Sequence, residues 1–108
     1  MIFHEVYIVK VRNSVIYIGM GKRGRHRHAE SGVSHVYGLN QLHFKNPEEV
    51  TTHVIQDNLT AERALELEIE LIKHYRPIYN KRDNEAFNNK YVPIQYIDEI
   101  TKKNRNKC

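Results

Sequence analysis

Two runs of apolar residues near the N-terminus predict a β-hairpin. Residues 5–11 and 15–19 are rich in the β-branched and aromatic side chains that favour strands, and residues 12–14 supply turn chemistry. Because both runs are almost continuously apolar, we expect the hairpin to be central in its sheet and covered on both faces. Polar and apolar residues alternate over 49–55, which predicts a third strand.

The clearest helix is predicted from Ala61 to about Tyr75. Thr60 is a suitable N-cap for it, and Pro77 ends it. At about 100° per residue, the apolar side chains of this segment form one broad arc around the helix. The arc consists of Ala61, Ala64, Leu65, Ile69, Leu71, Ile72 and Tyr75.

Glu68 lies at the centre of this apolar arc, one turn after Ala64 and one turn before Ile72. A carboxylate that faces a protein core is costly unless it is paired, protonated or bound to a cation. Helix geometry alone therefore leaves two interpretations of Glu68: a salt bridge to an arginine, or a metal ligand at the bottom of a cleft.

The remaining segments predict shorter elements. A short helix beginning near Gly24 is followed by a break at residues 31–34, and Ser34 can cap a second helix from His35 to about Phe44. Residues 81–90 are polar and predict a loop, and a short element follows over residues 94–100.

The predicted fold class is α/β in the broad sense (α+β), with a three-stranded antiparallel sheet flanked by helices. The strands are Val6–Val11, Val15–Met20 and Val50–Ile55. We expect a single domain over residues 1–100 and a basic C-terminal tail over residues 101–108.

Composition limits the class of protein. A chain of 108 residues with 40% hydrophobic and 28% charged residues is typical of one globular domain. It contains no apolar run near the ~20 residues of a membrane span, and its first residues do not resemble a signal peptide. The only cysteine, Cys108, excludes a disulfide framework and favours a reducing, cytoplasmic compartment.

The chain has a net charge of +4, and eight of its 17 Lys and Arg residues lie in two clusters. The first contains Lys22, Arg23, Arg25 and Arg27 with His26 and His28 between them, and the second contains Lys102, Lys103, Arg105 and Lys107. Such clusters can be solvated charge runs, but they also suit a polyanionic partner. Glycines surround the first cluster and a predicted strand leads into it, which favours nucleic-acid binding there.

Two tyrosines lie on the predicted hairpin, and Tyr17 is followed by Ile18-Gly19 and the glycine-rich basic turn. Tyr17-Ile18-Gly19 resembles the second half of the signature of the GIY-YIG endonuclease family. The segment around Tyr7 resembles the first half, except that Glu5 stands where the family usually has glycine.

The downstream order of residues resembles the family too. Its members carry a glutamate followed three and four residues later by leucine and isoleucine, and then a proline and an asparagine. Here Glu68 is followed by Leu71-Ile72, by Pro77 and, twelve residues after the glutamate, by Asn80. The resemblance spans residues 5–80, about 70% of the chain.

The family's arginine has two candidates. Counting from the YIG glycine as in the homing endonucleases gives Arg27, but the residue four positions later, usually histidine or tyrosine, is Ser31. A shorter turn, as in other branches of the family, gives Arg25 with His28 as its helical neighbour at i+3. We prefer Arg25 with His28, and keep Arg27 as the alternative.

The resemblance implies a metal-dependent endonuclease that hydrolyses DNA. Glu68 would hold one divalent ion, Mg²⁺ or Mn²⁺, and Arg25 or Arg27 would grip the scissile phosphate. Tyr7, Tyr17 and His28 would orient or deprotonate the attacking water, which requires neighbouring positive charge to lower a tyrosine pKa. Asn80 would position the site. DNA would be bound by Lys22, Arg23, Arg25, His26, Arg27, Lys102, Lys103 and Arg105.

Two other interpretations fit parts of the sequence. The basic clusters also fit a non-catalytic nucleic-acid-binding module with the same fold. A zinc site would draw on the seven histidines, but cysteine ligands other than Cys108 are lacking. A nuclease this small implies low sequence specificity or specificity through a homodimer, and small members of the family occur in bacteria, phages and mobile elements.

Overall fold

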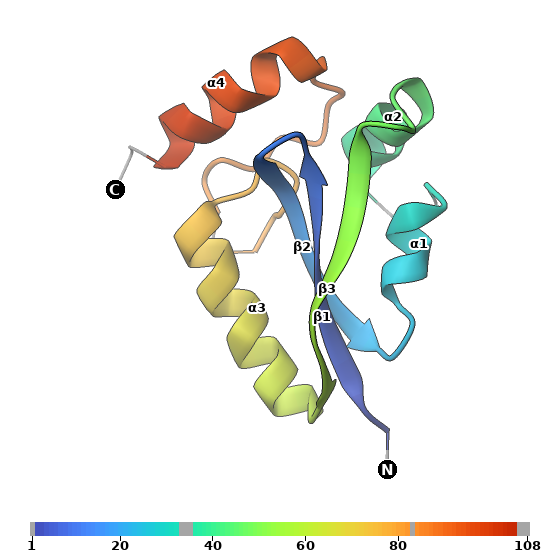
Figure 1. The fold of residues 1–108 in the computed structure, drawn as a ribbon. Coiled ribbons are helices and arrows are strands. Elements are labelled where there is room, and N and C mark those ends of the chain that lie inside the picture. The colour runs from blue at the N-terminus through green and yellow to red at the C-terminus, as the bar shows by residue number, and fades with distance from the viewer. Residues whose placement is uncertain (1, 33–35, 83, 106–108) are drawn as a thin grey trace.

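Three strands form an antiparallel sheet in the order β2-β1-β3. The computed structural model describes residues 2–32, 36–82 and 84–105, with side chains described as far as residue 100. The strands are β1 (His4–Val11), β2 (Ser14–Lys22) and β3 (Val50–Leu59). The predicted sheet is confirmed (Figure 1), and its third strand continues past the predicted end.

The predicted hairpin is buried on both faces, but only β1 is central, since β2 lies at an edge of the sheet. One face is covered by α3 (Ala61–Tyr75), which buries Ala64 and Ile72 against residues of β1 and β2. The other face is covered by α1 (His26–Glu30) and α2 (Tyr37–Lys45) (Figure 1). Helix α4 (Ile94–Arg105) crosses the end of the sheet and adds Ile94 and Ile97 to the same core cluster. The predicted arrangement of helices around the sheet is therefore confirmed.

Helix α3 begins and ends as predicted, but its buried stripe is narrower than the predicted arc. The Thr60 side chain accepts a hydrogen bond from the Arg63 N–H at 3.1 Å, which confirms the N-cap. Leu65 is 38% exposed, whereas Leu67, absent from the predicted arc, packs against the core. Periodicity gives the direction of an apolar face but not how much of it the neighbouring strands cover. Glu68 remains inside the covered stripe.

The shorter helices begin later than predicted. Helix α1 begins at His26, so that much of the basic cluster lies in β2 and in the turn before the helix. Helix α2 begins at Tyr37 with Val36 as its N-cap, and the predicted cap Ser34 lies outside the described residues. The predicted element after the polar loop is α4, whose backbone continues to Arg105. No helix in the described ranges combines the length and apolar character needed to cross a membrane.

Candidate active site

Tyr7 and Tyr17 lie beside each other on neighbouring strands. Tyr7 pairs with Gly19 and Tyr17 pairs with Val9, and the two tyrosine rings are 6.3 Å apart between centroids. A Cβ added at Gly19 would come within 2.3 Å of the Tyr7 ring. The glycine of the Tyr17-Ile18-Gly19 segment thus leaves the space that the other tyrosine occupies.

Asn80 holds the free edge of β2 next to Tyr17. Its side-chain oxygen accepts a hydrogen bond from the Ile18 N–H at 2.7 Å, and its side-chain nitrogen donates to the Ile18 carbonyl at 2.7 Å. The Tyr79 N–H donates to the Ile16 carbonyl at 3.1 Å, which extends the pairing along the same edge. Residues that follow α3 therefore act as a short extra partner for β2.

Glu68 opens into a pocket of about 480 Å³ that Tyr17, Asn80 and Arg82 also line. Its side chain is 14% exposed, and its Oε1 lies 3.5 Å from Nη1 of Arg82. Burial raises the pKa of Glu68, and the Arg82 guanidinium lowers it only in part. Arg82 is itself 55% exposed, so the salt bridge expected as one interpretation exists, but its partner is a surface arginine.

The two candidate arginines line different hollows. Arg25 lies against Gly21, where an added Cβ would come within 2.7 Å of its Cγ. Its charge lowers the pKa of both Tyr7 and Tyr17. Arg25 shares its hollow with His28, whereas Arg27 lines a different one, together with residues of β1 and β3. The structure therefore brings Arg25, and not Arg27, to the tyrosine pair.

Neither tyrosine has the lowered pKa that a base at neutral pH needs. Burial raises the pKa of Tyr7, and Tyr17 adds to the effect. Burial also raises the pKa of Tyr17, followed by the negative charge of Glu68, while Arg25 offsets only part of the rise. Arg25 lowers both pKa values as expected, but desolvation is the larger effect, so the charges of the protein alone leave both tyrosine pKa values raised.

Two residues of this region were not found by sequence analysis. Arg82 lies in an irregular segment, where no periodicity relates it to Glu68. Glu5 is only 2% exposed, and its carboxylate accepts hydrogen bonds from the N–H groups of Gly24 and His26 at 2.7 and 2.9 Å. The burial of Glu5 could have been predicted, because it is an acidic residue at the start of an apolar run.

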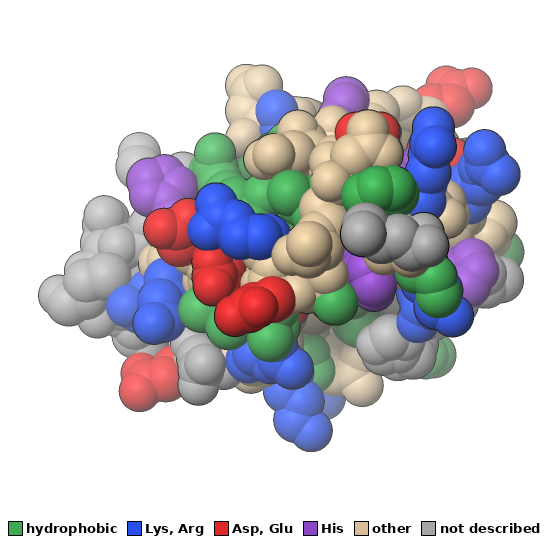
Figure 2. Space-filling model, turned by 90° about the horizontal axis from the view of Figure 1, so that it is seen from below, with side chains coloured by type: hydrophobic (Ala, Val, Ile, Leu, Met, Phe, Trp, Pro, Cys, Tyr) green, Lys and Arg blue, Asp and Glu red, His purple; other side chains and the backbone are tan. Residues whose placement is uncertain are grey.

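The surface charge differs between the two sides of the sheet. Viewed from below, Lys, Arg and His side chains crowd the side of α1, whereas on the side of α3 several acidic side chains lie among further Lys and Arg side chains (Figure 2). The side chains of Lys102, Lys103 and Arg105 lie outside the described part, as does Lys107. The basic cluster on the α1 side is thus the one whose side chains can be located.

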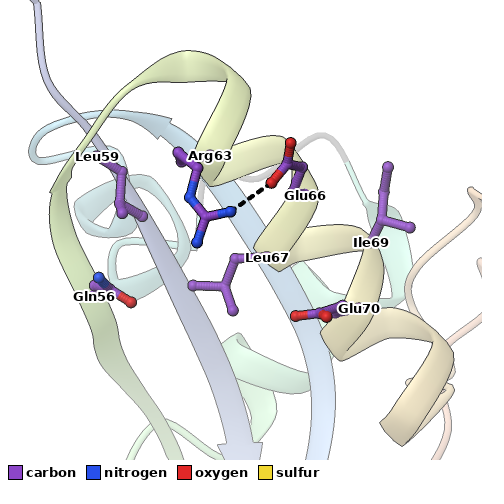
Figure 3. A pocket seen from close by; sticks show the side chains of 7 residues that line it. All are labelled: Gln56, Leu59, Arg63, Glu66, Leu67, Ile69 and Glu70. Atoms are coloured by element: carbon purple, nitrogen blue, oxygen red, sulfur yellow. Dashed lines mark hydrogen bonds and ion pairs between the residues drawn. The ribbon is translucent and has the colours of Figure 1, made fainter.

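A further hollow of about 410 Å³ lies between β3 and α3 (Figure 3). It is lined by Leu59, Leu67 and Ile69, and by an exposed ion pair in which Arg63 Nη1 lies 2.7 Å from Glu66 Oε2. None of the residues predicted for chemistry lines it. The candidate site is accordingly the pocket that contains Glu68 and Tyr17.

Comparison with known proteins gives one informative relative. The chain is similar to a solved structure of the GIY-YIG N-terminal endonuclease domain of UvrC from Thermotoga maritima, a point mutant bound to its catalytic divalent cation. The two are 33% identical, the match covers 73% of this chain and 83% of that chain, and the TM-score is 0.49.

Family models and curated proteins gave no match. The assignment rests on sequence identity over most of the UvrC domain and agrees with the ordered residues from Tyr7 to Asn80. The chain belongs to the GIY-YIG endonuclease family.

Proposed function

We propose that this protein is a metal-dependent endonuclease that hydrolyses phosphodiester bonds of DNA. The observation that carries the proposal is the position of Glu68, a largely buried carboxylate in the same pocket as Tyr17 and Asn80. One surface arginine offsets only part of its burial, so the carboxylate still gains from a cation.

The donor set fits a hard divalent ion. Carboxylate oxygens are preferred ligands of Mg²⁺, which keeps several waters and needs only one or two carboxylates. Within the described ranges, no three His, Cys, Asp or Glu side chains form a ready metal cluster, so Glu68 would hold the ion together with water. Such an ion, Mg²⁺ or Mn²⁺, supplies positive charge at the scissile phosphate and lowers the pKa of its bound water.

The remaining residues of the site divide the work of hydrolysis. Arg25 binds a phosphate oxygen and stabilises the negative charge that develops on it. Tyr7 and Tyr17 keep their protons at neutral pH, because burial raises the pKa of both, and their hydroxyl groups orient the attacking water. His28, on the same side of the turn as Arg25, accepts the proton of that water. Asn80 fixes the strand that carries Tyr17.

DNA is the proposed substrate because basic residues surround the site. Lys22, Arg23 and Arg25 line one hollow at the end of β2, and Arg25 is close enough to the tyrosine pair for its charge to lower the pKa of both. The relative from Thermotoga maritima is described as an endonuclease domain with a catalytic divalent cation, which supports the same class of reaction here. A homodimer stays a prediction, which sedimentation with and without duplex DNA would test.

The alternative is a binding module that keeps the fold without cutting. A cleavage assay on plasmid and linear duplex DNA, with Mg²⁺, with Mn²⁺ and with chelator, separates the two functions. We expect cutting only with a divalent ion, and a loss of orders of magnitude in Glu68→Ala. Glu70→Ala, an exposed carboxylate on the same helix, is the matched control and should cut normally.

DNA binding in metal-free buffer gives the second readout of that assay. Glu68→Ala should bind as well as the unmodified protein or more tightly, because a negative charge facing the phosphate is gone. Cutting by Glu68→Ala at a near-normal rate would exclude the mechanism. Binding without cutting under any metal condition would establish the module.

A further inference from the structure

The turn that carries Arg25 has little packing of its own. Arg23 and Arg25 are exposed, and Gly24 has a φ of +94° with no atom within 4 Å of where a Cβ would be. The N–H of Arg25 donates to the Lys22 carbonyl at 3.0 Å, which closes the turn, and the N–H of Arg23 donates to the Phe3 carbonyl at 3.1 Å, which ties the start of the turn to the residue before β1. The part of the turn that follows Arg23 needs an attachment of its own if Arg25 is to stay beside the tyrosines.

The carboxylate of Glu5 provides that attachment. Oε1 accepts a hydrogen bond from the Gly24 N–H at 2.7 Å, and Oε2 accepts one from the His26 N–H at 2.9 Å. These are the residues immediately before and after Arg25. One side chain on the central strand therefore anchors the backbone on both sides of the arginine.

His26 adds a third bond to the same carboxylate. Its Nδ1 lies 2.6 Å from Oε2 of Glu5, and its ring centroid is 6.5 Å from that of Tyr7. Glu5 is 2% exposed, so little of its carboxylate is open to water, and the His26 side chain is 21% exposed. Burial alone would raise the pKa of Glu5, but the hydrogen bonds from Gly24 and His26 outweigh it and lower the pKa.

We propose that Glu5 is a positioning residue for the cleavage reaction: it anchors the turn at Gly24 and His26 so that Arg25 is held beside Tyr7 and Tyr17. The inference rests on the proposed nuclease function. Glu5 stands where the family signature usually has glycine, which has no side chain and cannot make these bonds. In this chain a buried carboxylate therefore orders the turn, whereas the glycine of the signature has no side chain that could do so.

The effect on cleavage follows from geometry. Misplacing a catalytic group by about 1 Å can cost about 100-fold in rate. Loosening the turn should therefore lower the maximal single-turnover rate by about 10- to 100-fold. The affinity for DNA should change little, because the charge of Arg25 is still present. A purely structural role would instead reduce the amount of active protein without changing the rate of the folded fraction.

Two variants of Glu5 remove its hydrogen bonds to the turn in two steps. Glu5→Gln keeps the shape but has a single acceptor oxygen, so it can satisfy one of the two backbone N–H groups. Glu5→Gly, the signature residue, satisfies neither. Amide hydrogen exchange of the folded proteins should show one of Gly24 and His26 unprotected in Glu5→Gln, and both unprotected in Glu5→Gly. His26→Ala is the matched control, because it removes the ring and leaves both backbone bonds.

A double-mutant cycle with Arg25→Lys decides whether Glu5 acts through the arginine. If it does, Glu5→Gln should cost less than about threefold in single-turnover rate once Arg25 is already replaced. An equal loss in both backgrounds, or unchanged protection of Gly24 and His26, would overturn the proposal. If the unmodified protein cuts under no metal condition, the nuclease function fails instead, and amide exchange alone then decides whether Glu5 anchors the turn.

Discussion

Asn80 binds Ile18 through both ends of its side-chain amide, with two hydrogen bonds of 2.7 Å to one residue of the edge strand. The amide replaces the backbone partner that an edge strand lacks. Because Ile18 follows Tyr17, the same bonds fix the position of the Tyr17 backbone in the pocket that Tyr17 shares with Glu68. Asn80 is buried, so water cannot easily replace it.

Replacing Asn80 should affect both stability and cleavage. Asn80→Ala leaves the N–H and carbonyl of Ile18 without partners, and each buried unsatisfied group costs about 1–3 kcal/mol. Asn80→Asp keeps an acceptor for the Ile18 N–H but, when ionised, has no donor for the Ile18 carbonyl. A protonated aspartate regains an O–H donor, so the loss of stability in Asn80→Asp should be smaller in acid than at neutral pH. Chemical denaturation and cleavage rates check both variants. Unfolding and cleavage like those of the unmodified protein would show that β2 holds its position without Asn80.

Arg25 and Arg27 are separated by direct comparison. A phosphate contact made in the transition state, when lost, lowers the maximal rate far more than it weakens binding. We expect Arg25→Ala to lower the single-turnover rate by about 100-fold or more, on the scale of losing one charge-stabilising donor. Arg27→Ala should mainly weaken DNA binding. The opposite ranking would restore the alignment that counts from the YIG glycine.

The hairpin and α3 were predicted correctly because their signals are local. Alternation, apolar runs and a capping threonine each act within a few residues, and Thr60 caps α3 as expected. The width of the buried face of α3 depends on what packs against it, and for this reason Leu65 was wrongly placed in the core.

Family resemblance related residues that are far apart in the sequence, and the structure brings Tyr17, Glu68 and Asn80 to one pocket. Contacts that the resemblance does not cover were missed. Nothing in the sequence relates Arg82 to Glu68 or Glu5 to Gly24, because those contacts depend on how distant segments meet. The raised pKa values of the tyrosines are a second such case. Desolvation depends on the packed surroundings, which composition and spacing do not give.

The ionisation of the tyrosines can be measured directly. Because burial raises the pKa of Tyr7 and Tyr17, neither should ionise below about pH 10, the ordinary value, in metal-free protein. Burial also raises the pKa of Tyr79, to about 12. Ultraviolet titration of Tyr7→Phe and Tyr17→Phe should therefore match the unmodified protein up to pH 10. If the unmodified protein showed a tyrosine ionisation near neutral pH that either variant lacked, that tyrosine would already be able to act as a base without metal.

The basic C-terminal residues are expected to add affinity without chemistry. Helix α4 continues to Arg105, so substitution is a cleaner test than deletion. Replacing Lys102, Lys103, Arg105 and Lys107 by glutamine removes four charges that could each contact a phosphate. On counterion-release grounds, the salt slope of DNA binding should become shallower by up to about 4 units, with the maximal cleavage rate unchanged. An unchanged slope would show that these residues do not contact DNA.

The stability of the protein should depend on pH through the ionisation of Glu68. Burial raises its folded pKa above the ordinary value of 4.5, so the folded state binds the proton more tightly than the unfolded state. Stability from this group is therefore fully present below pH 4.5 and is lost as the pH rises through the folded value. Glu68→Gln lacks this ionisation, so its stability relative to the unmodified protein should increase from acid to neutral pH.

Divalent ions should reverse the stability difference between Glu68→Gln and the unmodified protein at neutral pH. A ligand that binds only the folded state raises its stability by mass action, so Mg²⁺ at pH 7 should raise the melting temperature of the unmodified protein. Glu68→Gln should gain little, because the amide is a poor substitute for a charged carboxylate ligand. Melting curves at pH 4.5 and pH 7, with Mg²⁺ and with chelator, give all four comparisons. If both proteins gained equally from Mg²⁺, the ion would be bound elsewhere, and Glu68 would be a buried carboxylate whose partner is Arg82.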